Sequence, residues 1–281
     1  MADSTLLDRR VMAVKIDNHR NARPQSAIQE AEAVFELLVE GGLTRFLALF
    51  HSVDSSYVGP IRSARSTEVA LLPSLGATLQ VSIRNPKVLA QAKVLGVDLF
   101  TQTRATTFSI DTRTAPHNLY GDTIAMRDYA NDRGYPDDPP PPMFVFGEPS
   151  TPDAPAGRIT LSWSGGNVIH WEYREERYLR FKGSSPHNWV DREGSSEQIA
   201  FDTLLVLVMD RHTSISNPSF NTLGAGRALL FYDGMVVDGT WSRSEIDEPF
   251  LLTTGDGESM VVPPGRIWIS VFPSIRTVSW E

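Results

Sequence analysis

The chain has 281 residues, of which 41% are apolar, and it carries 26 basic and 34 acidic side chains, for a net charge of −8. A chain of about 300 residues can bury about 75% of the surface that it exposes when unfolded, so this composition excludes intrinsic disorder. The absence of cysteine excludes disulfides, zinc–thiolate sites, iron–sulfur clusters and cysteine nucleophiles, and the negative charge disfavours non-specific binding to nucleic acid or to an anionic membrane.

The first half of the chain predicts a mixture of strands and helices. Apolar and polar residues alternate from Val11 to Asp17, which indicates a strand. Two apolar runs within residues 33–50, joined at Gly41-Gly42, predict a hairpin. A helix is expected from Ser63 to Leu72 with Ser63 as its N-cap. Another opens at Asn85-Pro86 and ends at Gly96.

A proline-rich segment separates two halves of different composition. Eight of the 19 prolines fall within residues 136–155, and such a segment favours an extended, stiff conformation. Phe144-Val145-Phe146 is expected to dock on one of the halves. Residues 1–135 hold 15 basic and 14 acidic side chains, whereas residues 136–281 hold 11 and 20. All six tryptophans lie beyond this segment, where we expect most of them to pack in a core rather than to stack on sugar rings.

The second half reads as antiparallel β-structure. Alternation over residues 159–163 and 168–173 on either side of Gly165-Gly166 predicts one hairpin, and Asp233-Gly234 between apolar runs predicts another. A late strand is expected over residues 267–272, and the spacing of these strands favours a small sandwich or open barrel. The predicted fold class is therefore α+β. It comprises a mixed α/β domain with an arginine-rich polar site (1–135), a proline-rich linker (136–157) and a mainly antiparallel β domain (158–281).

The 33–50 hairpin offers one candidate cluster. If Gly41-Gly42 form a two-residue turn, Leu38 faces Arg45, and Glu36 and Glu40 lie diagonally on either side of Arg45 on one sheet face. Carboxylates around a guanidinium group are one interpretation of this spacing. The alternative is a ladder of solvated surface ion pairs, worth about 0–1 kcal/mol each.

Two further polar motifs point to a ligand site. Arg62 and Arg65 bracket Ser63, and if Ser63 caps a helix, the guanidinium groups and the helix N-terminus form an anion site. Alternatively, these arginines pair with Glu36, Glu40 or Asp17 and only tie the fold together. Asp17-Asn18-His19 follows a strand, so that Asp17 is a candidate to orient His19 as an acid–base pair, the alternative being an ordinary turn.

Other kinds of chemistry receive little support. His19, His51 and His117 lack the spacing of a metal motif, so no metal and no cofactor are predicted. Lipase, NTPase and dinucleotide-binding motifs are absent. No segment has the roughly 20 apolar residues that span a bilayer, and the start of the chain lacks an export signal and a lipobox cysteine. We expect a soluble polypeptide, in which Met1-Ala2 is compatible with a cytosolic start and with the replacement of a removed signal.

Several motifs in order resemble those of the YerB-like putative lipoproteins, a bacterial family described by paired N- and C-terminal domains of unknown function. In the first half these are Val14-Lys15-Ile16-Asp17-Asn18-His19, Ala22-Arg23-Pro24-Gln25, Glu40-Gly41-Gly42-Leu43-Thr44-Arg45-Phe46, Val58-Gly59-Pro60-Ile61-Arg62-Ser63-Ala64-Arg65 and Ala115-Pro116-His117-Asn118-Leu119-Tyr120. In the second half they are Gly224-Ala225-Gly226-Arg227-Ala228, Asp233-Gly234, Gly239-Thr240-Trp241 and Pro264-Gly265-Arg266-Ile267-Trp268.

The resemblance implies a two-domain protein that is extracytoplasmic and associated with the cell envelope through a lipid anchor, and it implies no established reaction. The sequence departs from the family in having no anchor cysteine. It also has Ser82-Ile83-Arg84-Asn85 where the family has a glycine- and serine-rich turn, which suggests a different ligand if that turn makes contact with it.

The family motifs coincide with the polar positions reached from spacing. We therefore expect one cleft in the first domain that binds an anionic ligand such as a cell-wall glycan, a peptide carboxylate or a phosphorylated polymer, with Asn118 and Tyr120 on its rim. The expected ligand-binding residues are Asp17, Asn18, His19, Arg23, Gln25, Glu40, Arg45, Arg62, Ser63, Arg65, His117, Asn118 and Tyr120. The second domain is expected to be either a β support or a docking surface for a further partner, an envelope protein. The alternative function is a glycan-acting hydrolase or lyase that uses Glu36 and Glu40 with His19.

Overall fold

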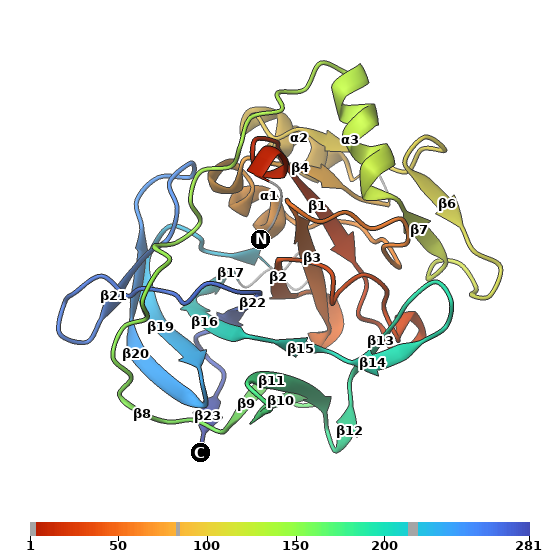
Figure 1. The fold of residues 1–281 in the computed structure, drawn as a ribbon. Coiled ribbons are helices and arrows are strands. Elements are labelled where there is room, and N and C mark those ends of the chain that lie inside the picture. The colour runs from red at the N-terminus through yellow and green to blue at the C-terminus, as the bar shows by residue number, and fades with distance from the viewer. Residues whose placement is uncertain (1–3, 83–84, 213–218) are drawn as a thin grey trace.

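The computed structural model describes residues 4–82, 85–212 and 219–281. One large sheet runs through the molecule and takes strands from both halves of the chain (Figure 1). Within the described residues, its order from edge to edge is β21 (Leu251–Thr254), β20 (Met235–Arg243), β19 (Gly224–Tyr232), β16 (Thr203–Met209), β22 (Ile267–Pro273), β2 (Ala33–Leu38), β3 (Thr44–Phe50), β1 (Val11–Ile16), β4 (Ala77–Gln80) and β5 (Leu99–Phe100), with β8 (Ala154–Pro155) beside β20.

Strand β22 joins the two halves at the centre of this sheet. It runs parallel to β2 of the first half and parallel to β16 of the second, with Ile267 opposite both Ala33 and Thr203. Each residue of β22 is buried. Strands buried on both faces are continuous apolar runs, which is what the sequence of β22 provides. Main-chain hydrogen bonds of one sheet therefore connect the segments on either side of the proline-rich region.

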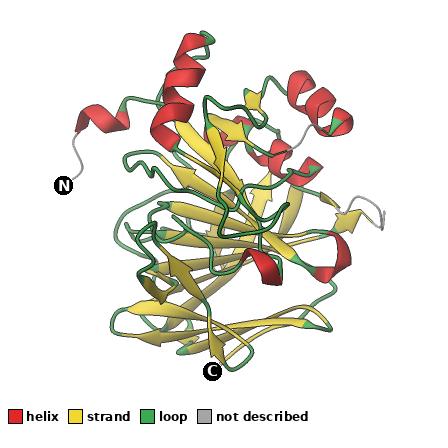
Figure 2. Ribbon diagram, turned by 90° about the vertical axis from the view of Figure 1, so that its right-hand side faces the viewer, coloured by secondary structure: helices red, strands yellow, loops and turns green. Residues whose placement is uncertain are grey.

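A second sheet, from the second half alone, packs against the large one (Figure 2). The rings of Trp163 and Phe272 are 4.9 Å apart and those of Trp171 and Trp268 are 5.2 Å apart, so tryptophans fill the space between the sheets. The predicted core role is confirmed for Trp163, Trp171, Trp241 and Trp268, each at most 2% exposed. The strands of this sheet, in order, are β12 (Ser185–Pro186), β11 (Arg177–Lys182), β10 (Asn167–Arg174), β9 (Arg158–Ser164) and β23 (Val278–Trp280), with β15 (Ala200–Phe201) beside β11.

The helices gather at the end of the molecule away from the second sheet (Figures 1 and 2). They are α1 (Ser66–Leu71), α2 (Pro86–Val94) and α3 (Thr123–Asp132). Short 3-10 turns are formed by Ser4–Leu7, Arg20–Ala22, Glu40–Gly42 and Pro73–Leu75, and the turn at Glu40–Gly42 contacts the second sheet, where Ser164 donates to the Gly42 carbonyl oxygen. Small two-stranded sheets pair β6 (Thr107–Ser109) with β7 (Leu119–Gly121), β13 (Asn188–Val190) with β14 (Ser196–Gln198), and β17 (Arg211–His212) with β18 (Ser219–Phe220). None of the described helices is long and apolar enough to cross a membrane.

Most of the predicted elements are confirmed, and the composition is that of an α+β protein rich in strands. The hairpins β9–β10 and β19–β20 turn where the glycine motifs place them. Asn85 caps α2 by accepting a hydrogen bond from the Lys87 N–H at 3.1 Å. In the proline-rich segment, Phe144 docks on the core at 5% exposure, while Phe146 is 46% exposed and pairs with Val262.

Candidate functional site

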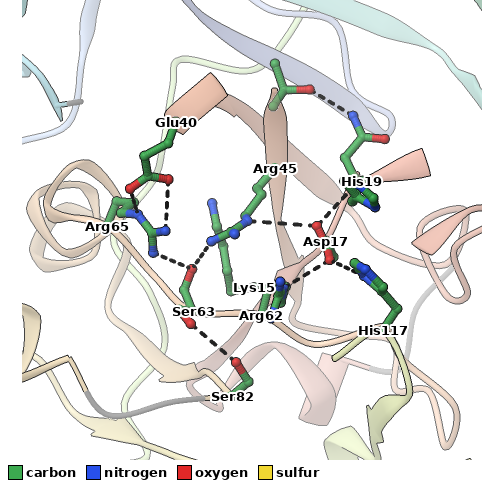
Figure 3. Close-up of polar contacts among 12 residues, drawn as sticks. Lys15, Asp17, His19, Glu40, Arg45, Arg62, Ser63, Arg65, Ser82 and His117 are labelled. Atoms are coloured by element: carbon green, nitrogen blue, oxygen red, sulfur yellow. Dashed lines mark hydrogen bonds and ion pairs between the residues drawn. The ribbon is translucent and has the colours of Figure 1, made fainter. Parts of the chain in front are cut away.

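Asp17 collects polar groups from several segments of the first half. It directly follows β1, and its carboxylate accepts hydrogen bonds from the His19 N–H at 3.1 Å and from Arg62 Nε at 3.1 Å. His117 Nδ1 lies 2.8 Å from Asp17 Oδ2, and Arg45 Nε lies 3.9 Å from Oδ1 (Figure 3). The Asp17 side chain is only 4% exposed, so the chain buries an acid here and surrounds it with donors.

The surroundings of Asp17 keep it ionised. Burial raises the pKa of the carboxyl group, but the His19 N–H, Arg45 and Arg62 together outweigh burial, and the pKa is lowered overall. An ionised carboxylate accepts hydrogen bonds only, so we assign a proton to Nδ1 of His117, which leaves Nε2 of the neutral ring as an acceptor. His19 stacks on His117 with ring centroids 4.8 Å apart. Burial, together with the neighbouring His117, lowers the pKa of His19.

Arg45 and Arg65 continue this network away from Asp17. Arg45 donates to the Ser63 carbonyl oxygen at 2.9 Å. Arg65 donates two hydrogen bonds, of 2.6 and 2.9 Å, to the Glu40 carboxylate (Figure 3). Burial raises the pKa of Glu40, but the contacts with Arg65, a main-chain N–H and the nearby Arg45 together lower it by more, so Glu40 is held as a carboxylate. We call the connected residues the Asp17 cluster: Asp17, His19, Glu40, Arg45, Arg62, Ser63, Arg65 and His117.

The predicted register of the hairpin is wrong by one residue. Arg45 faces Leu37 rather than Leu38, because the connection is a 3-10 turn at Glu40–Gly42 instead of a two-residue turn. Gly41 and Gly42 both have positive φ, 69° and 73°, which lets the chain take this wider turn. The predicted Glu36–Arg45–Glu40 cluster is therefore not formed.

Each glutamate of that prediction has an arginine of its own. Glu40 pairs with Arg65, and Glu36 turns inward and pairs with Arg180 of the second half. In the observed register Glu36 lies opposite Phe46, so it is on the other sheet face from Arg45. Every residue of β2 is buried, and Arg180 of the second sheet reaches Glu36 on the face that this sheet covers.

Ser63 is not the N-cap of a helix, contrary to the prediction. Helix α1 begins at Ser66 with Arg65 as its cap, and the Glu68 carboxylate accepts the Arg65 N–H at 2.6 Å. Ser63 is used differently: its carbonyl oxygen accepts from Arg45, and its hydroxyl lies 3.5 Å from that of Ser82. The anion site expected at a free helix N-terminus is thus replaced by an internal carboxylate. Ile83 and Arg84 of the unusual turn lie outside the described residues.

Asn18, Arg23 and Gln25 lie next to the Asp17 cluster and bind one another. Asn18 Oδ1 accepts from Arg23 Nε at 2.9 Å and from Gln25 Nε2 at 3.1 Å, while Asn18 Nδ2 donates to the Thr44 hydroxyl at 2.8 Å. Gln25 also donates to the Asp17 carbonyl oxygen at 3.0 Å. These side chains fix the loop after β1 and so position Asp17.

Asn118 and Tyr120 do not join the Asp17 cluster. The Asn118 side chain donates to the Ile110 carbonyl oxygen at 3.4 Å across the β6–β7 hairpin. Tyr120 is 1% exposed and stacks on Tyr57 at 4.5 Å, and burial raises its pKa to about 12. The prediction that Tyr120 lies on a rim is wrong, because Tyr120 is packed in the interior with the other two residues of β7.

Two buried ion pairs escaped the sequence analysis. Arg180 Nη2 lies 2.7 and 2.8 Å from the two oxygens of Glu36, which also accept from Trp268 and Thr44. Lys15 pairs with Glu68 in α1, and burial lowers its pKa to about 8 even though Glu68 opposes the shift. A charged residue inside an apolar strand, as Lys15 is, was a weak indication of a buried ion pair. The pairing of Glu36 with Arg180 had no such indication, because it joins residues that are 144 positions apart in the chain.

Metal ligation finds no support in the geometry. Over the ranges that the structure describes, no three His, Asp or Glu side chains gather as metal ligands would. The carboxylates of the Asp17 cluster are instead used by arginines, which bind them bidentately or through Nε.

Two family models match the chain. Residues 1–136 match the N-terminal domain of a protein family of unknown function, DUF3048, and residues 159–269 match the C-terminal domain of the same family. The chain is 25% identical to the putative lipoprotein YerB of Bacillus subtilis (strain 168), over 99% of this chain and 85% of that protein. The crystal structure of YerB from Bacillus subtilis has the same fold, with a TM-score of 0.84 at 24% identity over 99% of this chain and 97% of that one.

Proposed function

We propose that this chain, which belongs to the DUF3048 family of proteins of unknown function, is a cell-envelope protein that binds an anionic ligand at the Asp17 cluster. The location follows from the description of its relative YerB as a putative lipoprotein. The ligand class follows from the charges of the cluster, and the anionic fragments of the cell-wall glycan are the natural candidates outside the membrane. A further envelope protein is a proposed partner through the second half.

The observation that carries this proposal is the way Arg62 is held. Its Nε donates to Asp17, and its side chain is 20% exposed. Within the described residues, no hydrogen bond uses its two terminal nitrogens. A guanidinium group that is anchored by one nitrogen and open at the other two is preorganised to bind a carboxylate or phosphate with both.

The charge balance around Arg62 favours the same ligand. Three guanidinium groups, those of Arg45, Arg62 and Arg65, face two carboxylates, those of Asp17 and Glu40. The two histidines add hydrogen-bonding groups without adding negative charge. The cluster therefore keeps an excess positive charge in a chain that is negative overall, and an anion would neutralise it.

Binding of muropeptides tests the proposal. Muropeptides released from purified cell wall carry free carboxylates, and isothermal titration calorimetry would measure their affinity for the wild type, R62A and R62K. We expect R62A to weaken binding by about tenfold or more, the cost of one charge-assisted contact, and R62K to recover part of it. R104A is the matched control, because Arg104 is exposed and lies outside the cluster. Equal affinity of R62A and wild type would contradict the proposal.

A second candidate function is acid–base chemistry on the same ligand. The specific observation is the 2.8 Å contact of Asp17 with His117, which leaves Nε2 of His117 for a substrate or a water molecule. Glu36 and Glu40 suit this role less well, because both are bound by arginine side chains. Release of soluble fragments from cell wall by the wild type, and its loss in H117Q with retained binding, would support catalysis. Absence of release from the wild type would leave binding alone.

A further inference from the structure

A cavity of about 550 Å³ lies outside the Asp17 cluster, where the loop after β1 meets the second sheet. Arg23 and Pro24 come from the first half of the chain, and Lys182 and His187 come from the second. The neutral polar side chains of Ser185, Asn188 and Ser196 complete its mouth, and all three residues are exposed. We call this cavity the Arg23–Lys182 pocket.

The two cations of this pocket have neutral partners. Arg23 donates to the side-chain and main-chain oxygens of Asn18, at 2.9 and 2.7 Å, and Lys182 donates to Asn167 Oδ1 at 3.0 Å. In the described part of the chain, neither forms a salt bridge. Arg180 lies nearby as a third cation and takes both oxygens of Glu36 for itself. The carboxylate among these three cations, that of Glu36, is thus bound by Arg180, and Asp17, which also acts on Arg23, is itself bound by Arg62.

The pocket histidine adds no negative charge and is fixed in its neutral form. Arg180 donates to Nδ1 of His187 at 3.2 Å, so the ring proton is on Nε2 and is donated to Gln25 Oε1 at 3.0 Å. Burial, together with Arg180, Arg23 and Lys182, lowers the pKa of His187 well below its ordinary value.

The crowding of cations is visible in the lysine as well. Burial, with Arg23 and Arg180, lowers the pKa of Lys182 to about 8, and Glu36 offsets only part of this effect. Burial and Arg180 likewise lower the pKa of Arg23 to about 10. Like charges brought together out of water are unfavourable unless an anion joins them.

We propose that the Arg23–Lys182 pocket is a second ligand site, which binds the phosphate group of a phosphorylated sugar or polyol. An arginine fork beside a lysine ammonium group is suited to a phosphate dianion. The pocket is larger than a free phosphate ion requires, and Ser185, Asn188 and Ser196 can hydrogen-bond hydroxyl groups, while Pro24 and Pro186 provide apolar walls. The site is distinct from the Asp17 cluster, although Asn18 contacts Arg23 and adjoins Asp17.

Three probes at equal ionic strength test the proposal: glucose 6-phosphate, inorganic phosphate and glucose. Calorimetric titration of the wild type should give the highest affinity for glucose 6-phosphate, a lower one for phosphate and none for glucose. K182M should weaken glucose 6-phosphate binding by about tenfold or more, and K182R should retain most of it. K93M is the matched control, because Lys93 is exposed on α2.

Further measurements distinguish binding at this pocket from binding at the Asp17 cluster and from non-specific effects of salt. R62A should leave glucose 6-phosphate binding unchanged, whereas K182M should leave muropeptide binding unchanged. Binding should also weaken as the pH rises through about 8, where Lys182 loses its proton. Equal affinities of K182M and wild type would overturn the proposal, as would a thermal stabilisation that sodium chloride reproduces. Equal affinities for phosphate and glucose 6-phosphate would overturn the sugar component.

Discussion

Replacing Glu36 by glutamine should remove the charge that compensates Arg180 in the core. Glu36 is 1% and Arg180 is 0% exposed, and their contacts are 2.7 and 2.8 Å. Breaking one side of such a buried pair costs about 3–5 kcal/mol. The aromatic rings of Phe46, Trp171 and Trp268 lie 4.8–5.5 Å from the Arg180 guanidinium carbon, and their cation–π interactions should stabilise the unpaired charge in part. We therefore expect E36Q to lower the free energy of unfolding by about 3 kcal/mol.

Urea unfolding of E36Q, R180M and the double variant measures this coupling directly. Trp268 donates to Glu36 Oε2 at 3.1 Å, so tryptophan fluorescence reports on the site. R180M alone should also destabilise, whereas E36Q/R180M should recover much of the loss, because the glutamine still accepts from Trp268 and no buried charge remains. A double-mutant cycle on the solvent-exposed pair Arg158 and Glu172, in which Arg158 is 46% exposed, should give a coupling free energy of at most about 1 kcal/mol. A coupling below about 0.5 kcal/mol between Glu36 and Arg180 would refute the reasoning.

Two further predictions concern other parts of the molecule. The pKa of Lys15 is about 8 in the folded protein and near 10.5 in the unfolded chain. Between these pH values the unfolded chain keeps the proton on Lys15 and the folded protein has lost it. The free energy of unfolding should therefore rise with pH over this range, by up to about 1.4 kcal/mol per pH unit. Urea unfolding of K15M from pH 7.5 to 10.5 should show a smaller rise, with Lys182 contributing the remainder; an unchanged slope would be inconsistent with a desolvated Lys15. A Cβ atom at Gly239 would lie 2.0 Å from the Thr253 carbonyl oxygen, so G239A should cost about 1–3 kcal/mol. G255A, where the nearest atom is 3.6 Å away, should be tolerated, and similar melting temperatures of the two variants would count against this packing.

Local patterns were sufficient to predict many elements. The alternation of residues 11–16, the Asn85-Pro86 helix start and the Asp233-Gly234 turn each depend on neighbours in sequence, and each is confirmed. The register of β2 against β3 was missed because it depends on one residue more or less in a glycine turn. That single residue decides whether Glu36 shares a sheet face with Arg45 or with Phe46.

The candidate site was only partly accessible to sequence reasoning. The structure brings Asp17, Arg45, Arg62 and His117 together. The sequence suggested His19 as the partner of Asp17, because the two are close in the chain. In the structure the imidazole that contacts the Asp17 carboxylate is that of His117. Of the two cations in the Arg23–Lys182 pocket, only Arg23 was among the ligand-binding residues expected from the sequence. The charged members of the pocket, Arg23 and Lys182, come from opposite halves of the chain, so no spacing rule connects them.

The position of β22 has a consequence for how the polypeptide matures. Until residues 267–273 have been synthesised, β2 has no neighbour on one side, because Ala33 pairs with Ile267. Until β22 docks, the amino-terminal segment therefore has an open, apolar strand edge, which invites self-association. Separate production of residues 1–136 should yield aggregates, and addition of the remaining segment during refolding should restore soluble protein, as expected if the two family domains fold as one cooperative unit.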